Sequence, residues 1–113
     1  MSEYLYLYRG GETGRTPQQM QEQMQRWGDW FKELGQKGAL KNPGQPLEPA
    51  GKVLRGNNKS VTDGPFAEAK DVVGGYSIVD AKDIDSATEL ARGCPIFRSG
   101  GSVEVRPVMK IEM

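Results

Sequence analysis

The chain has 113 residues, the size of one domain, and its 15 basic and 15 acidic residues cancel to a formal charge of zero. A neutral chain lacks the basic field that nucleic acids attract, and no apolar run approaches the roughly 20 residues that cross a bilayer, so nucleic-acid and membrane partners are excluded. The sequence contains no histidine and one cysteine, which excludes Ser-His and Cys-His catalysis, His-based metal sites and an intrachain disulfide.

These exclusions leave a single domain over residues 1–113 for which we expect no cofactor and no metal. The first residues, MSEYLYLYRGG, lack the charged and then apolar pattern of a secretory signal. We therefore expect a cytoplasmic location.

The first predicted element is a β-strand over residues 4–8, where tyrosines alternate with leucines. The tyrosines either pack in a core with their hydroxyls at its rim or line a cavity. The Gly-rich segment Arg9–Arg15 lacks the Gly-Lys-Ser/Thr ending of a phosphate-binding loop, so we interpret it as a connection or a lid.

A long helix is predicted to begin at Thr16, which has the N-cap residue type and is followed by Pro17 and Gln19. The helix should end near Gly35 or Gly38, and we expect Gly28 to approach the sheet closely. An apolar stripe at helical spacing forms its buried face. The stripe consists of Met20, Met24, Trp27, Phe31 and Leu34, and Trp30 joins the same side.

The segment Gln36–Gly51 is rich in proline and predicts a covering loop with no regular element. Two short strands, residues 52–55 and 59–62, follow around a tight Gly-Asn-Asn turn. A further strand covers residues 72–79, and its Gly-Gly pair suggests a bulge or close contact with another backbone or a ligand. A second helix begins after Asp83, and the last strand spans residues 103–113, where Pro107 favours a bulge or an edge.

The order β, α, β, β, β, α, β predicts an α+β fold, a ferredoxin-like βαβββαβ subunit whose two helices lie on one face of an antiparallel sheet. The other face also reads as apolar, and we assign to it Tyr4, Tyr6, Tyr8, either Val73 or Tyr76, and the strand beginning at Val103. Because an apolar face of this size requires a partner, we expect a homodimer in which two sheets pack face to face.

A rigid elbow, residues 63–70 (DGPFAEAK), offers candidate site residues. Asp63 is the candidate acid or base, because Phe66 and a tryptophan wall would raise its pKa by desolvation. The alternative is architectural, with Asp63 accepting backbone hydrogen bonds in its own turn. Cys94 is either a buried inert thiol or a reactive one. The candidate ligand-binding residues are Trp27, Trp30, Phe66, Lys70, Tyr76, Arg55 and Tyr6.

The elbow, with Ser60-Val61-Thr62 before it, resembles the signature of DGPF-domain proteins within the YCII-related group. The resemblance covers nearly the whole chain and includes Trp27-x-x-Trp30-Phe31-x-x-Leu34, Gly38-Ala39-Leu40, Gly74-Gly75-Tyr76 and Ala91-Arg92-Gly93-Cys94-Pro95. It implies a dimeric α+β barrel built from ferredoxin-like subunits. Some YCII-related proteins have a His–Asp dyad, but Trp27 and Cys94 stand at the corresponding positions here, so its chemistry is not carried over.

Two functions follow as hypotheses. The first is a small-molecule-binding homodimer that can also be an enzyme, with a site between the sheet and the first helix or inside the dimer barrel. The second is a non-catalytic regulatory or interaction protein, and the family resemblance links it to an extracytoplasmic-function sigma factor by association alone. A pocket with convergent polar groups favours the first, and apolar surface left over after dimerisation favours the second.

Overall fold

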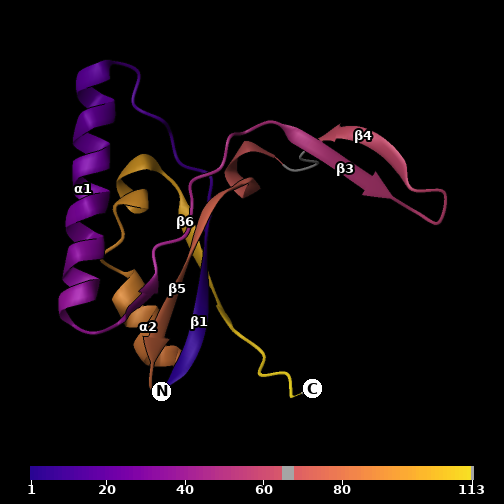
Figure 1. Cartoon of the computed structure of the whole chain (residues 1–113). Helices are drawn as coiled ribbons and strands as arrows, with labels where there is room; N and C mark the ends of the chain where they lie inside the picture. The colour runs from indigo at the N-terminus through magenta and orange to yellow at the C-terminus, as the bar shows by residue number, and fades with distance from the viewer. Residues whose placement is uncertain (65–67, 113) are drawn as a thin grey trace.

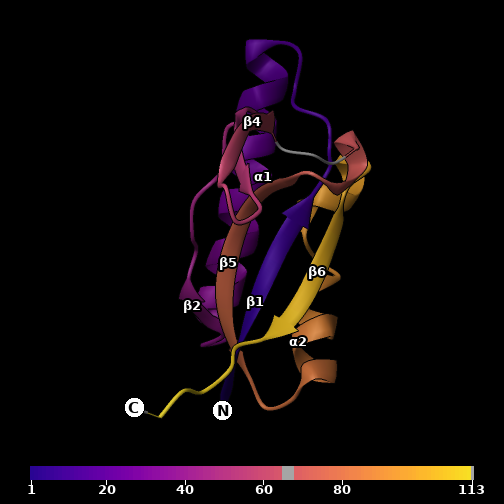
Figure 2. The same cartoon turned by 90° about the vertical axis from the view of Figure 1, so that its right-hand side faces the viewer.

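The computed structural model describes residues 1–64 and 68–112, and Figures 1 and 2 show it in two views. Two helices cover one face of a four-stranded antiparallel sheet with the strand order β2-β5-β1-β6. The elements are β1 Ser2–Arg9, α1 Pro17–Gln36, β2 Leu40–Asn42, β3 Gly51–Arg55, β4 Ser60–Gly64, β5 Val73–Ala81, α2 Ile84–Ala91, β6 Ser102–Pro107 and the 3₁₀ helices Ala69–Asp71 and Pro95–Ser99.

The sheet confirms the predicted α+β class with ferredoxin-like topology. Its six main elements follow the order β1-α1-β2-β5-α2-β6, and β3 and β4 are inserted between β2 and β5. The prediction of a covering loop over Gln36–Gly51 was wrong, because β2 lies in that segment and pairs with β5. The strands predicted at 52–55 and 59–62 exist, but they form a separate two-stranded sheet.

The start of α1 follows the predicted cap. The Gln19 backbone N–H donates to the Thr16 hydroxyl at 3.1 Å, and the Thr16 N–H donates to the Gln19 side chain at 3.3 Å. This reciprocal capping box satisfies two N–H groups that have no partner within the helix. The helix ends before Gly38, whose φ of 70° is a left-handed conformation that glycine adopts without strain.

The three tyrosines of β1 face the helices and are buried in the core. The Tyr6 hydroxyl donates to the Ala87 carbonyl, and the Tyr8 hydroxyl donates to Ser77 Oγ at 2.8 Å. Ser77 in turn donates to the Pro43 carbonyl at 2.6 Å. The packing alternative is therefore the one the structure supports, because these hydroxyls are used within the core and do not line a cavity.

The uncovered face of the sheet was assigned to the wrong side chains of β1 and β6, whereas the Tyr76 alternative on β5 was right. Since the tyrosines and the Val103 side of β6 face the helices, the opposite face carries Leu5 and Leu7 of β1 and Tyr76 and Ile78 of β5. The pairs Leu7–Tyr76 and Leu5–Ile78 are cross-strand partners, so the four side chains form one patch. We call this set the sheet patch.

The apolar stripe of α1 is only half covered by the chain itself. Trp30 and Leu34 are buried, and Trp27 and Phe31 pack against the core, but none of residues 17–26 is buried. The predicted burial of Met20 and Met24 was therefore wrong. The predicted close approach of Gly28 was also wrong, because a Cβ at that position would meet no atom within 4 Å.

The segment after β2, residues 43–47, runs along the edge of β5, and we call this segment the strap. The Leu47 N–H donates to the Gly74 carbonyl at 2.9 Å, and Pro46 forms an isolated bridge with Gly75. A Cβ on Gly75 would lie 3.0 Å from the Gln45 carbonyl oxygen. The predicted close backbone contact at the Gly-Gly pair is therefore confirmed for Gly75.

The inserted hairpin projects from the body as an arm, on the side of the sheet away from the helices (Figure 1). We call Gly51–Gly64 the arm. Its strands pair in register from Gly51–Gly64 to Arg55–Ser60. Among the described residues, no helix is long and apolar enough to cross a membrane.

Candidate functional site

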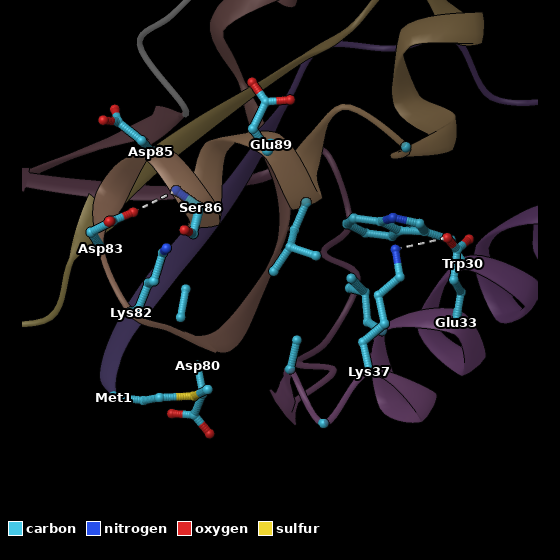
Figure 3. Close-up of a pocket in the computed structure, with 16 residues that line it drawn as sticks. Met1, Trp30, Glu33, Lys37, Asp80, Lys82, Asp83, Asp85, Ser86 and Glu89 are labelled. Carbon is cyan, nitrogen blue, oxygen red and sulfur yellow. Dashed lines mark hydrogen bonds and ion pairs between the residues drawn. The ribbon is translucent and has the colours of Figure 1, made fainter.

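A groove of about 690 Å³ lies between α1 and α2 (Figure 3). The second half of α1 forms one wall, and α2 with the turns before and after it forms the other. The residues that line it are Met1, Trp30, Glu33, Leu34, Lys37, Gly38, Ala39, Asp80, Ala81, Lys82, Asp83, Asp85, Ser86, Glu89, Leu90 and Gly93.

The floor of the groove is apolar and rigid. Trp30 and Leu34 belong to the core, where the Trp30 ring stacks on Tyr6 with a centroid separation of 6.1 Å. A Cβ on Gly93 would lie 3.2 Å from the indole nitrogen of Trp30, so glycine allows the end of α2 to approach this ring. The floor therefore offers an aromatic edge and aliphatic surface that are already fixed in place.

The rim of the groove carries charges of both signs. Lys37 pairs with Glu33 at 3.1 Å on α1. Asp83 caps α2 by accepting from the Ser86 backbone N–H at 2.8 Å, and this hydrogen bond lowers the pKa of the Asp83 carboxyl. Lys82 lies beside it and acts in the same direction. The arrangement suits a small molecule with an apolar body and a polar end.

The sequence candidates on α1 and β1 divide between groove and core. Trp30 lines the groove, whereas Trp27 packs edge-on against Tyr8 at a centroid distance of 4.8 Å. Tyr6 is fully buried and bonded to Ala87. Burial raises the pKa of the Tyr6 and Tyr8 phenols well above the ordinary value of 10.0. These phenols are therefore protonated near neutral pH and serve as packing groups.

Cys94 lies in the same core. Burial raises the pKa of its thiol from 9.0 to about 12, so the nucleophilic thiolate is scarce near neutral pH. The structure therefore supports the inert alternative for this residue. Trp27 and Cys94, at the two positions of the dyad, both belong to the packed interior.

The candidates from the elbow and the arm lie elsewhere. Asp63 is at the end of β4, its side chain is 89% exposed, and it pairs with Lys52 at 2.5 Å. The expected desolvation of this carboxyl by a tryptophan wall was therefore wrong for a single subunit, because the arm carries it away from the helices. Arg55 is on the same arm and exposed. A catalytic role for Asp63 stays a prediction.

The remaining candidates are also separate from the groove. Lys70 is exposed and lies 3.8 Å from Glu68, and Tyr76 belongs to the sheet patch. Phe66 lies outside the described residues. Among the predicted ligand-binding residues that the structure describes, only Trp30 lines the groove.

Sequence reasoning missed most of the groove. Asp83 was recognised as a helix cap and not as a rim residue, and Lys37, Lys82 and Ser86 gave no signal because charged surface residues are common on helices. The Gly93 position next to a helix end was the one available indication, since it permits the approach to Trp30.

A comparison with known families gives a match to the YCII-related domain over residues 3–112. The chain belongs to the YCII-related domain family. An uncharacterised protein of Rhizobium meliloti (strain 1021) is 43% identical over 49 residues, which cover 42% of this chain and 40% of that protein. The matched part of the chain thus spans about two fifths of the length of this curated relative.

Among solved structures, the chain is similar to 5-chloro-2-hydroxyhydroquinone dehydrochlorinase from Burkholderia phenoliruptrix AC1100 in complex with 2,5-dihydroxybenzoquinone. The TM-score is 0.49 at 18% identity, and the match covers 95% of this chain and 93% of that one. At this level of similarity, neither the activity nor the ligand of that enzyme is transferred to this chain.

Proposed function

We propose that this YCII-related protein is a homodimer that binds a small organic molecule with an apolar body in the groove between α1 and α2. The observation that carries the binding proposal is the fixed apolar floor under a rim of mixed charge. Ligand sites in proteins are typically concave, mostly apolar and provided with a few polar groups that fix orientation. Five carboxylates and two lysines line the groove, so its rim favours a neutral or cationic ligand over an anionic one.

The dimer proposal rests on the sheet patch. Leu5, Leu7, Tyr76 and Ile78 form an apolar centre on a face that neither helix covers. In a two-fold dimer, the same face of each subunit packs against its copy, so both apolar faces are covered by one interface.

Ion pairs flank the sheet patch. Arg9 bonds Glu104 at 2.9 Å, and Arg106 bonds the same carboxylate at 3.2 Å. The hydrogen bond from Arg106 lowers the pKa of Glu104 most, and the hydrogen bond from Arg9 lowers it further, so this carboxyl stays ionised. An apolar centre with a charged rim is the usual anatomy of a protein interface.

Groove binding is tested with three probes that share a phenyl body: phenethyl alcohol, phenethylamine and phenylacetate. We expect millimolar affinities for the alcohol and the amine, as is usual for molecules of this size, and a weaker affinity for phenylacetate, all followed through the Trp30 indole N–H and Gly93 amide resonances. Ser86→Phe should block the groove, whereas Thr88→Phe, on an exposed helical position outside it, should not. If no probe shifts these two resonances in the wild-type protein, groove binding is ruled out.

Dimerisation is tested by sedimentation equilibrium with Ile78→Asp. A carboxylate from each subunit in the apolar centre should raise the dimer Kd by at least about 100-fold, because each buried unpaired charge costs several kcal/mol. Ile84→Asp is the matched control, since Ile84 is exposed at the start of α2 on the helix side. A wild-type monomer at about 100 µM would contradict the dimer, because standard interfaces associate well below that concentration.

The second candidate is a non-catalytic interaction protein, favoured by exposed apolar side chains on the arm. It differs from the first in predicting no probe binding in the groove. A sigma-factor partner stays an expectation from the family resemblance alone. The cytoplasmic location also stays a prediction.

A further inference from the structure

The arm exposes two large apolar side chains side by side. Leu54 and Val61 are cross-strand partners, so they lie on one face of the hairpin, and they are 63% and 59% exposed. The Lys52–Asp63 pair lies on the same face, two residues nearer the body. An isolated two-stranded hairpin is marginally stable in water, so this face needs another surface to cover it.

The first half of α1 offers an uncovered apolar surface. Met20 and Met24 are one turn apart on one side of the helix, and they are 46% and 74% exposed. They continue the stripe that reaches Trp27, whose ring packs on Tyr8 of the sheet. Methionine side chains are unbranched and adapt to irregular partner surfaces.

The arm and the sheet patch lie on the same side of the molecule. Figure 1 shows the arm leaving the body on the side of the sheet away from α1 and α2. A hollow of about 310 Å³ lies at its base, with walls that include Val53 of the arm and Val72 and Val73 of the body. A second copy seated on the sheet patch would therefore meet the arm at this hollow.

We propose that the arm of each subunit crosses the dimer and lays Leu54 and Val61 on Met20 and Met24 of the partner subunit. This inference rests on the proposed homodimer and commits to a second copy of this chain as the occupant. Two-fold symmetry makes the exchange reciprocal, so both uncovered surfaces are used twice. Asp63 shares the docking face, so the arm also carries this carboxylate to the partner's first helix.

The test measures oxidation of Met20 and Met24 by hydrogen peroxide, followed by mass spectrometry. Two arm variants are compared with the wild type. In the first, Asn-Gly replaces residues 52–63, because Gly51 and Gly64 are cross-strand partners that a two-residue turn can join. In the second, Leu54→Thr with Val61→Thr keeps β-propensity and removes apolar surface, and Thr62→Ala on the opposite face is its control.

We expect Met24 to oxidise about 10-fold more slowly in the wild-type dimer than in either arm variant. This ratio of rates corresponds to about 1.4 kcal/mol. The Thr62→Ala control should oxidise at the wild-type rate. Heterodimers then assign the direction. When an isotope-labelled armless chain pairs with an intact chain, the protected methionines should be those of the armless chain. Protection of the intact chain's own methionines would overturn the exchange.

The possible failures are distinguishable. A wild-type dimer in which Met24 oxidises at the rate seen in the armless variant refutes the arm exchange and leaves the proposed dimer intact. A wild-type monomer refutes the proposed dimer first, and the exchange with it.

Discussion

Replacing Gly44 with alanine tests how the strap is held against the sheet. Gly44 has a φ of 73°, and a Cβ built there would lie 1.7 Å from the Tyr76 carbonyl oxygen and 2.7 Å from its carbonyl carbon. Real contacts of this kind are longer than 3.0 Å, so the strap must move away from β5 by more than 1 Å. The alanine variant cannot be accommodated by a side-chain rotation, because the obstacle is backbone.

The expected loss of stability has two parts. The left-handed conformation costs an alanine about 1 kcal/mol. Displacing the strap weakens the hydrogen bonds from Ser77 to Pro43 and from Leu47 to Gly74, which are 2.6 and 2.9 Å long, at about 1 kcal/mol each. With some lost packing, Gly44→Ala should lower the free energy of unfolding by roughly 3–5 kcal/mol.

Gly38→Ala is the matched control. Gly38 has a φ of 70°, and a Cβ there would meet nothing within 4 Å. It should cost only the conformational part, about 1 kcal/mol. Urea unfolding followed by tryptophan fluorescence measures both, at one protein concentration because a dimer makes the midpoint depend on concentration. Equal losses in the two variants, within about 0.5 kcal/mol, would refute the steric reasoning.

Two further predictions concern the core. Ser77→Ala should lower the free energy of unfolding by roughly 1–3 kcal/mol, because the buried Tyr8 hydroxyl and the Pro43 carbonyl lose their hydrogen bonds to Ser77. In a Tyr8→Phe background the same change should lower it measurably less, and a double-mutant cycle measures the difference. Stability should fall as pH rises from about 9 towards 12, because the Cys94 thiol has a folded pKa of about 12 against 9.0 and the unfolded state loses its proton first. Cys94→Ser should make the free energy of unfolding fall less steeply between pH 9 and 12. If it falls as steeply as in the wild type, the pH dependence comes from other groups.

Local sequence patterns predicted the elements better than their pairing. The Thr16 cap, the alternation in β1 and the cap at Asp83 are each set by neighbouring residues, and the structure has all three. The three-residue strand at Leu40–Asn42 is too short to show a period, so its pairing with β5 could not be anticipated. The stronger signals at 52–55 and 59–62 were assigned to the main sheet, whereas they belong to the arm.

The orientation of β1 shows why the faces were exchanged. Tyrosine and leucine are both large and apolar in body, so alternation alone does not say which set faces the helices. The helix side provides the Ala87 carbonyl and the Ser77 hydroxyl, which satisfy Tyr6 and Tyr8. Burying the tyrosines there costs no unsatisfied polar group, and the leucines have no polar group to satisfy on the uncovered face.

The candidate site depended on contacts that no local pattern encodes. Trp30 was predicted from its aromatic ring, but its place on the groove floor follows from the packing of α2 at Gly93. The groove lies between the two helices, and its rim is made of ordinary surface charges. Residue type therefore identified one residue of the floor, and the remaining groove residues required the tertiary structure.

The ionisable side chains that could act as nucleophiles are buried, so the residues available to contact a ligand or a partner are those on the surface. The phenols of Tyr6 and Tyr8 and the Cys94 thiol, which would supply nucleophilic chemistry in a histidine-free chain, are buried in the core with raised pKa values. Asp63 is exposed in one subunit, yet it shares the arm face with Leu54 and Val61. If the arm crosses the dimer, this carboxylate moves from water to the interface with the partner subunit's first helix. Asp63→Asn therefore separates the two environments: a changed dimer Kd in sedimentation equilibrium supports a place for Asp63 in the interface between subunits, and an unchanged Kd assigns Asp63 to the solvated surface.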